Sequence, residues 1–131
     1  MPEKRIILEM GTGNDLYGGD YTKAARRAVQ DALHHSSITL FSSLGISHQE
    51  MRVQVTIAVQ EPDQVDCEKV AADLPRGKAE VSAVFGGLDV VDDGAQTKHV
   101  IATAAIEAFV PDQAGKFKLS QAWPFQAVTH L

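Results

Sequence analysis

Residues 5–34 read RIILEMGTGNDLYGGDYTKAARRAVQDALH, and the order of signals in this stretch predicts a strand, a turn and a helix. Arg5 to Met10 is short, apolar and rich in β-branched side chains, which is typical of a buried strand. The glycine-containing cluster 11–15 predicts a turn that ends this strand. Asp20 is a candidate N-cap, because its carboxylate can accept hydrogen bonds from the free amides of a first helical turn.

The residues after Asp20 predict an amphipathic helix. Apolar residues recur at the spacing of one helical face, at Ala25, Ala28, Val29, Ala32 and Leu33. Polar residues fall on the other side, at Lys23, Arg26, Arg27, Gln30 and His34. Since the apolar face is mostly alanine, we expect the helix to approach its support closely.

Three further segments predict strands. Arg52 to Gln60 alternates strictly between apolar and polar residues, as in a half-buried strand. Ala79 to Phe85 predicts the next strand. His99 to Val110 predicts a strand buried on both faces, with a helix as the alternative because of its four alanines. Its only acid, Glu107, needs a partner, and Arg52 and Lys98 are the candidates.

The segments between these strands predict one more helix and two loops. Val65, Val70, Ala71 and Leu74 indicate a short amphipathic helix that ends at Pro75. Residues 36–49 predict a loop with a short helical turn. Residues 88–98 are acidic and contain glycine, which predicts a turn-like connection.

The resulting order, β-α-β-α-β-β, predicts a single α/β domain over residues 1–110, with a four-stranded mixed sheet and helices on one face. Residues 111–131 predict an irregular tail that docks on its own or a neighbouring subunit, because it carries three aromatic residues, Phe117, Trp123 and Phe125. The second face of the sheet would be uncovered in a monomer, which indicates an interface. The topology resembles the Bacillus-type chorismate mutase and YjgF-like superfolds, whose sheets close into trimers. This resemblance implies a homo-oligomer, with a trimer favoured.

Composition narrows the classes of function. The chain has 131 residues and 12 Lys and Arg against 17 Asp and Glu, a formal charge of −5, which argues against nucleic acid as a partner. No apolar run reaches the roughly 18–20 residues that span a bilayer, so no membrane partner is expected. The single cysteine, Cys67, excludes an internal disulfide and fits the cytoplasm.

The run GTGNDLYG at residues 11–18, followed by a helix that begins DYTKAA, resembles a small family of uncharacterised conserved hypothetical proteins from bacteria and plants. The hallmark of that family is G-x-G-x-D-x-H-G, and Gly11, Gly13, Asp15 and Gly18 match it. The resemblance continues weakly over most of residues 4–110. Tyr17 stands where the family has histidine, so a metal or proton-transfer role is not carried over to it. The family has no established reaction, and the resemblance therefore implies a site without a mechanism.

The same segment predicts a ligand pocket on physical grounds. Glycines before a helix let backbone amides approach a ligand, and free amides at a helix N-terminus favour anions. The candidate catalytic residues are Asp15, as an orienting group or base, and Tyr17, as a hydrogen-bond donor. The candidate ligand-binding residues are Gly11, Gly13, Gly18, Asp20, Lys23 and Arg26. In the alternative interpretation, Asp15 only bonds local amides and Asp20 only caps the helix.

We therefore expect a protein that binds or transforms a small polar or anionic metabolite at this turn, near a subunit interface. The alternative is a non-catalytic oligomeric scaffold. A minor alternative is a tautomerase-like enzyme that uses the amine of Pro2 as a base, although the charged residues 3–5 that follow are unfavourable surroundings for it.

Other chemistries lack support in the sequence. A dinucleotide fingerprint fails because Leu16 stands where its third glycine is needed, and a Walker loop is absent. His34 and His35 are adjacent and would point about 100° apart on a helix, so they cannot chelate one metal. The remaining histidines stand alone in sequence, at His48, His99 and His130. We expect no metal and no cofactor.

Overall fold

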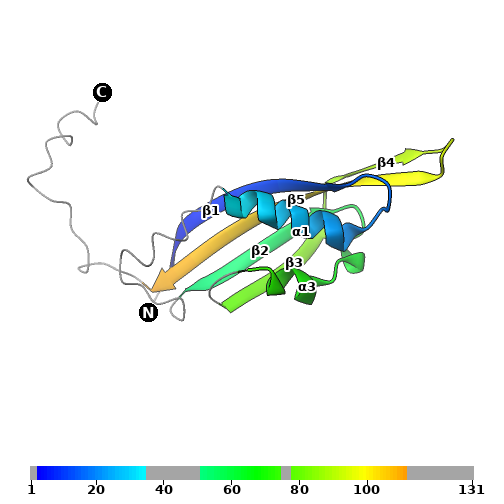
Figure 1. The fold of residues 1–131 in the computed structure, drawn as a ribbon. Helices are drawn as coiled ribbons and strands as arrows, with labels where there is room; N and C mark the ends of the chain where they lie inside the picture. Colours follow the sequence, from blue (N-terminus) through cyan, green and yellow to red (C-terminus); the bar gives the residue numbers. More distant parts are fainter. Residues whose placement is uncertain (1–2, 35–50, 75–77, 112–131) are drawn as a thin grey trace, which may run out of the picture.

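The computed structural model describes residues 3–34, 51–74 and 78–111, and in it two helices cover one face of a mixed sheet (Figure 1). The strands are β1 (Glu3–Asp15), β2 (Arg52–Val59), β3 (Lys78–Phe85), β4 (Leu88–Asp92) and β5 (Thr97–Pro111). The helices are α1 (Tyr21–His34), the short α3 (Cys67–Ala72) and one turn of 3-10 helix, η1 (Pro62–Gln64). The predicted α/β class, with helices on one face of a mixed sheet, is confirmed.

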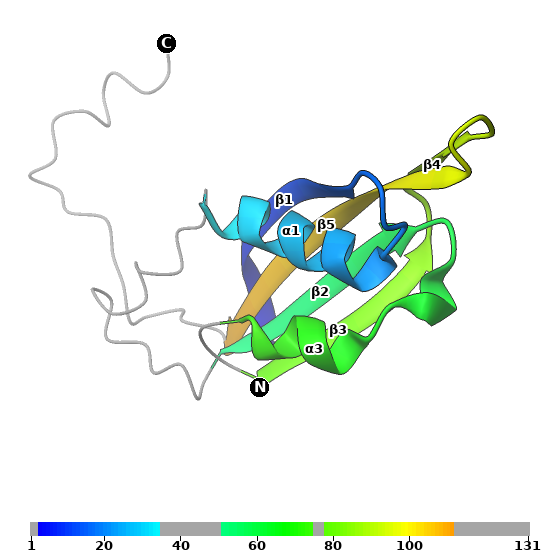
Figure 2. The same cartoon turned by 45° about the vertical axis from the view of Figure 1, so that its right-hand side comes forward.

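The sheet has five strands rather than the four predicted, in the order β1-β5-β2-β3. β5 lies between β1 and β2 and is antiparallel to both, whereas β2 and β3 are parallel. The fifth strand, β4, pairs with the start of β5 and forms a hairpin that projects beyond the rest of the sheet (Figure 2). The prediction of a turn over residues 88–98 was therefore wrong. Its turn signals belong only to the tip of this hairpin, at Asp93 to Gln96.

β1 corrects the sequence analysis in a second place. The strand does not stop at the cluster 11–15 but runs through it to Asp15. A Cβ on Gly11 would lie 2.5 Å from the carbonyl oxygen of Ala28, and a Cβ on Gly13 would lie 2.3 Å from the Ala28 nitrogen. These two glycines are needed because the backbone of α1 lies directly over the strand, and the chain turns only after Asp15.

β5 is a strand, as predicted in preference to a helix. Only its helix-covered face is fully buried, however, while residues on the other face are half-buried, so the prediction of burial on both faces was wrong. Glu107 lies on this second face. It pairs with Arg5 at 3.1 Å rather than with either partner considered from the sequence.

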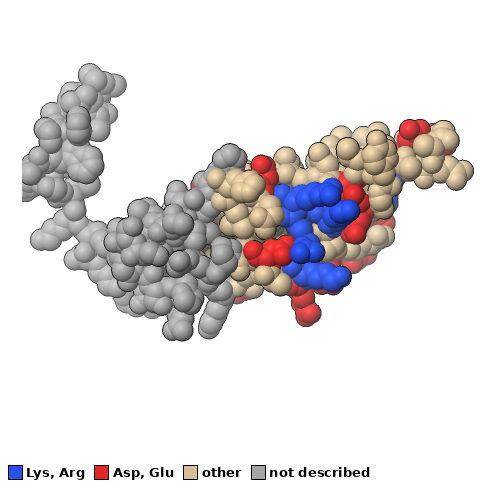
Figure 3. Space-filling model, in the orientation of Figure 1, with Lys and Arg blue, Asp and Glu red and all other residues tan. Residues whose placement is uncertain are grey.

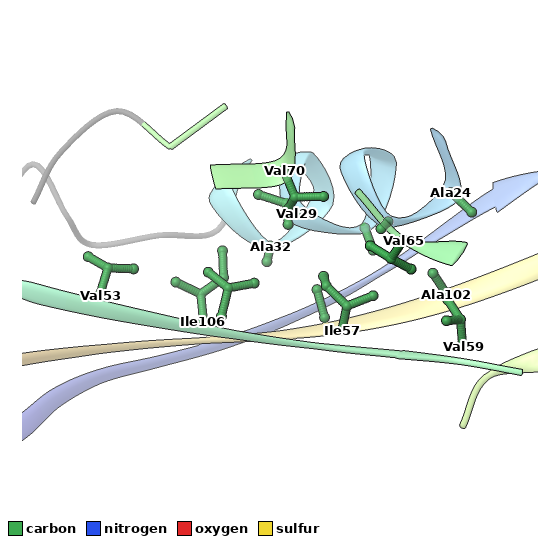
Figure 4. Packing of buried hydrophobic residues seen from close by; sticks show 14 of the residues in the cluster. Ala24, Val29, Ala32, Val53, Ile57, Val59, Val65, Val70, Ala102 and Ile106 are labelled. Atoms are coloured by element: carbon green, nitrogen blue, oxygen red, sulfur yellow. The ribbon is translucent and has the colours of Figure 1, made fainter. Parts of the chain in front are cut away.

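The core lies between the helices and the sheet (Figure 4). Apolar side chains of β2 and β5 meet the alanine-rich face of α1, and the labelled members include Val53, Ile57, Ala24, Val29 and Ala32. The predicted alternation of β2 and the predicted apolar face of α1 are confirmed. α3 is shorter than predicted and is capped by Asp66, whose side chain accepts from the Lys69 amide.

Several predictions concern residues outside the described part of the chain. They are the loop over residues 36–49, the tail after Pro111, and the roles weighed for Pro2, His35, His48 and His130. In the described part, neither helix is long or apolar enough to cross a membrane.

Candidate functional site

A pocket of about 540 Å³ opens where β1 ends and α1 begins. It is lined by Asp15, Leu16, Tyr17, Gly18, Asp20, Lys23 and Arg27. Five of the predicted site residues therefore come together here, namely Asp15, Tyr17, Gly18, Asp20 and Lys23. Arg27 was not assigned to the site from the sequence, although it lies one helical turn after Lys23 and on the same exposed side of α1.

Asp15 is the buried polar residue of this pocket, with an exposed fraction of 6%. Its Oδ2 accepts a hydrogen bond from the Asp20 amide at 2.8 Å. Its Oδ1 lies 3.7 Å from Nη1 of Arg27 and 4.0 Å from Nζ of Lys23. A buried carboxylate needs such partners because desolvation disfavours an isolated charge. One oxygen of Asp15 therefore fixes the turn, and the other faces two cations and offsets part of their positive charge.

Asp20 begins α1 as its N-cap. Its Oδ1 accepts from the Lys23 amide at 3.1 Å, and its carbonyl oxygen accepts from the Ala24 amide at 3.0 Å. The local bonds of the alternative interpretation are thus present, since Asp15 does bond a nearby amide and Asp20 does cap the helix. They do not occupy Oδ1 of Asp15, which faces the cations.

The two cations of the pocket lie at the surface, where Lys and Arg side chains gather over α1 (Figure 3). The side chains of Lys23 and Arg27 are 56% and 52% exposed. Arg27 is oriented by a 2.6 Å hydrogen bond from Nη1 to the Asn14 carbonyl oxygen. Guanidinium and ammonium groups carry several donors each, so both cations retain donors for a ligand.

Arg26 points to a different partner. It forms a two-point ion pair with Asp73, at 2.7 and 3.1 Å, and so joins α1 to the end of α3. It lines a smaller hollow of about 250 Å³ together with Lys23, Arg27, Gln30 and Asp73. The ion pair raises the pKa of the Arg26 guanidinium, chiefly through the hydrogen bonds to Asp73.

Gly11 and Gly13 lie in β1 beneath α1 and do not line the pocket. The Thr12 amide donates to Oδ2 of Asp31 at 3.0 Å, so it points to the free edge of β1. Because successive amides of a strand point to opposite sides, the amides of Gly11 and Gly13 are directed at β5. Gly18, by contrast, packs against Asp15, where an added Cβ would lie 2.8 Å from Oδ2.

A second polar cluster beside the start of α1 was not predicted from the sequence. The hydroxyl of Tyr21, a residue only 2% exposed, bonds Oε2 of Glu61 at 2.8 Å and also Oδ2 of Asp89. Lys98 Nζ lies 3.0 Å from Oε2 of Glu61 and 4.7 Å from the centroid of the Tyr21 ring. Its four members come from four separate segments, and no spacing in the sequence links them.

Burial and these contacts change the ionisation of the cluster. Burial, followed by the hydrogen bond to Asp89, raises the pKa of Tyr21 to about 12. Hydrogen bonds with Tyr21 and Glu61 raise the pKa of Lys98, and bonds from Tyr21 and Lys98 lower the pKa of Glu61. Asp89 Oδ1 is buried and has no hydrogen-bond partner among the described residues.

Tyr17 stands at the rim of the pocket and is 75% exposed. Its ring meets the His99 ring edge-on, with 5.4 Å between the centroids. Nδ1 of His99 is buried and makes no hydrogen bond within the described ranges. Those ranges contain no group of three or more His, Cys, Asp or Glu side chains placed to hold a metal ion.

The geometry defines a mixed α/β domain with a polar pocket at the start of its long helix, and the comparisons assign it to a family. The chain belongs to the Lin0512 family of conserved hypothetical proteins, whose model matches residues 5–108. The predicted membership of a conserved hypothetical family is therefore confirmed. The matched span contains both the pocket and the Tyr21 cluster.

The solved structures include a similar one, an FtsZ-like protein of unknown function from Nostoc punctiforme PCC 73102. Its TM-score with this chain is 0.74 at 35% sequence identity, and the match covers 86% of this chain and 99% of that chain. No curated protein matches.

Proposed function

We propose that this protein binds a small anionic metabolite in the pocket at the start of α1. The observation that carries the proposal is the arrangement of Lys23 and Arg27, two exposed cations that converge on the buried carboxylate of Asp15. Asp15 holds the two side chains near each other before a ligand arrives. A preorganised pair of cations binds a carboxylate or phosphate with less loss of side-chain entropy than two free ones.

Each lining residue has a role in this proposal. Lys23 and Arg27 donate charge-assisted hydrogen bonds to the anion. Asp15 orients the ligand through the cations it holds, and the Tyr17 hydroxyl donates from the rim. Asp20 caps α1 and so fixes the position of Lys23. The positive end of the helix macrodipole adds to the attraction for an anion.

A thermal-shift screen against phosphate, sugar phosphates and di- and tricarboxylates tests the proposal. We expect at least one class to raise the melting temperature, since a ligand that binds only the folded state stabilises it. Lys23→Gln and Arg27→Gln should each weaken binding of that ligand by about tenfold or more. Lys69→Gln is the matched control, because Lys69 is an exposed lysine of α3 that does not line the pocket. A screen without stabilising anions, or an equal loss with Lys69→Gln, would overturn the proposal.

We also propose that the protein works in the cytoplasm as a homo-oligomer, with a trimer favoured. The support is the face of the sheet that no described helix or strand covers, and on which exposed Leu8 and Met10 lie. Light scattering should give three times the chain mass of 14.1 kDa. A monomer at micromolar concentration would contradict this part alone.

The same uncovered face favours the second candidate function, a non-catalytic oligomeric scaffold. Asp15→Asn separates the two, because it removes the charge of Asp15 and keeps its shape. Loss of the ligand-induced thermal shift with assembly intact supports the binding protein. Loss of the oligomer itself supports the scaffold.

A further inference from the structure

The face of the sheet opposite the helices has the composition of a contact surface. The strand register places Met10, Ala105, Thr56 and Ser82 in one row across it. The next row consists of Thr12, Thr103, Ala58 and Val84. Small side chains therefore form a flat centre. Large apolar side chains flank it, with Leu8 47% and Met10 67% exposed on β1, and Val84 45% exposed on β3.

Two ion pairs lie on this face at one end of the sheet, and Glu80 of β3 is exposed on the same face in the row of Glu107. Arg5 pairs with Glu107 at 3.1 Å, and Arg52 pairs with Glu3 at 3.0 Å. The Arg52 guanidinium also stacks 4.4 Å above the centroid of the Phe109 ring. Burying an unpaired charge is costly. Because the charges of the two ion pairs already have partners, another surface can cover them without that cost.

The size of the face matches a stable protein–protein contact. Four strands about 4.8 Å apart and eight residues long at about 3.3 Å per residue give roughly 500 Å², and the β4–β5 hairpin adds about 150 Å². Two such faces together remove about 1,300 Å² of flat area, within the roughly 1,200–2,000 Å² of specific interfaces. Neither pocket lies on this face, so a small ligand is a poor occupant.

We propose that the face of the sheet opposite α1 and α3 is the surface through which copies of this chain associate, with each sheet packed against those of the neighbouring copies. A flat, apolar-centred surface with internal ion pairs suits further copies of itself, because neither of the pockets among the described residues lies on it to receive a different partner. The proposal rests on the oligomer of the proposed function but not on the ligand. It adds which residues of that face lie at the contact, with Met10 and the small side chains beside it at the centre.

Met10→Lys tests this surface, with Ala72→Lys as the matched control. Met10 is 67% exposed in one chain, so lysine leaves no cavity there and the fold should persist by circular dichroism. At the contact it would bury an unpaired charge, and we expect the dissociation constant of the oligomer to rise by at least about 100-fold. Ala72 is exposed on α3, on the helix side, so Ala72→Lys adds the same charge and should assemble as the wild type does.

Oxidation of the wild-type chain by peroxide gives a second readout that needs no variant. We expect Met10 to oxidise more slowly at high than at low protein concentration, by about threefold or more, because assembly covers it. Met51, which is 1% exposed, should react slowly at both concentrations. Assembly that survives Met10→Lys, or Met10 oxidation that is independent of concentration in an oligomer, would overturn the surface but leave the oligomer standing. A wild-type chain that stays monomeric would overturn both the contact surface and the oligomer. Neither the assembly result nor the oxidation result tests the proposal of ligand binding.

Discussion

Asp15 has a structural role in the turn between β1 and α1 and an electrostatic role in the pocket. Its Oδ2 holds the Asp20 amide, whereas its Oδ1 faces Lys23 and Arg27. A single carboxylate thus serves both the helix start and the pocket, which explains why a structural and a functional interpretation of the sequence were both consistent with the same residue.

Asp15→Ala should destabilise the fold more than Asp15→Asn. Alanine removes the acceptor of the Asp20 amide and the counter-charge of two cations, so we expect a loss of about 2–3 kcal/mol. Asparagine keeps an acceptor oxygen and loses only the charge, and about 1 kcal/mol is expected. Urea denaturation measures both free energies of unfolding. Equal losses would show that Oδ2 contributes nothing to the turn.

Gly13→Ala should be strongly destabilising, because the new Cβ would meet the backbone nitrogen of Ala28 at 2.3 Å. Backbone atoms cannot move aside as a side chain can, so we expect a loss of about 3 kcal/mol or more. Gly94→Ala is the control, since a Cβ there meets nothing closer than 3.6 Å. It should change the stability by no more than about 0.5 kcal/mol in thermal or urea unfolding. A Gly13→Ala protein as stable as the wild type would contradict the close approach of α1 to β1.

At the level of elements, the Tyr21 cluster joins the start of α1 to the end of β2 and to the β4–β5 hairpin. Tyr21 belongs to α1, Glu61 follows β2, and Asp89 and Lys98 belong to the two strands of the hairpin. The hairpin projects from the sheet, and a two-stranded hairpin alone is only marginally stable. This cluster is therefore an anchor for the hairpin.

The cluster predicts a loss of stability in alkali. The pKa of Tyr21 is raised from 10.0 to about 12 in the folded chain, so the neutral phenol is favoured by folding. Its contribution is complete below pH 10 and is lost as the pH rises through 12, an effect of about 2–3 kcal/mol. The raised pKa of Lys98 acts in the same direction. Urea denaturation between pH 8 and pH 12 measures the effect.

Tyr21→Phe should flatten this alkaline decline and lower stability at pH 8 by about 1–2 kcal/mol, because Glu61 and Asp89 lose their donor. Tyr17→Phe is the control, since Tyr17 is 75% exposed and should leave the alkaline decline unchanged. If the stability of Tyr21→Phe still declines in alkali, the decline is caused by groups other than Tyr21.

The sequence predicts elements well where one periodicity dominates. The alternation of β2 and the alanine face of α1 each specify one buried side, and both are confirmed. The glycine run of β1 misled the prediction, because a glycine that admits a neighbouring helix looks the same in sequence as one that permits a turn. The hairpin was missed because β4 is short, its apolar residues Leu88, Val90 and Val91 remain exposed, and the acidic tip follows it directly.

The site was predictable to the extent that it is local in sequence. The residues that line the pocket come from one continuous segment, residues 15–27, and most were identified as candidates. Arg26 was assigned to the site because its neighbours lie there, but its partner Asp73 is 47 residues away. The Tyr21 cluster depends on strand register and hairpin position, which no local pattern contains.

At the scale of the whole molecule, the described core does not extend beyond Val110. A chain shortened after Pro111 keeps every member of this described core, and we expect it to keep its circular dichroism spectrum and a cooperative unfolding transition. A change in mass by light scattering would favour docking of the tail on a neighbouring subunit, which is one of the two docking sites that the sequence predicts. Loss of cooperative unfolding would show instead that residues 112–131 complete the domain.

The close contact of α1 with β1 has a mechanical consequence. Where Gly11 and Gly13 lie, no layer of side chains separates helix backbone from strand backbone. This contact between α1 and β1 is stiff, because no side chains lie between the two backbones that could move to absorb a displacement. We expect a twist imposed on the sheet from the face opposite α1 to shift the helix that carries Lys23 and Arg27. A contact made on one face of the sheet should therefore influence the pocket on the opposite face.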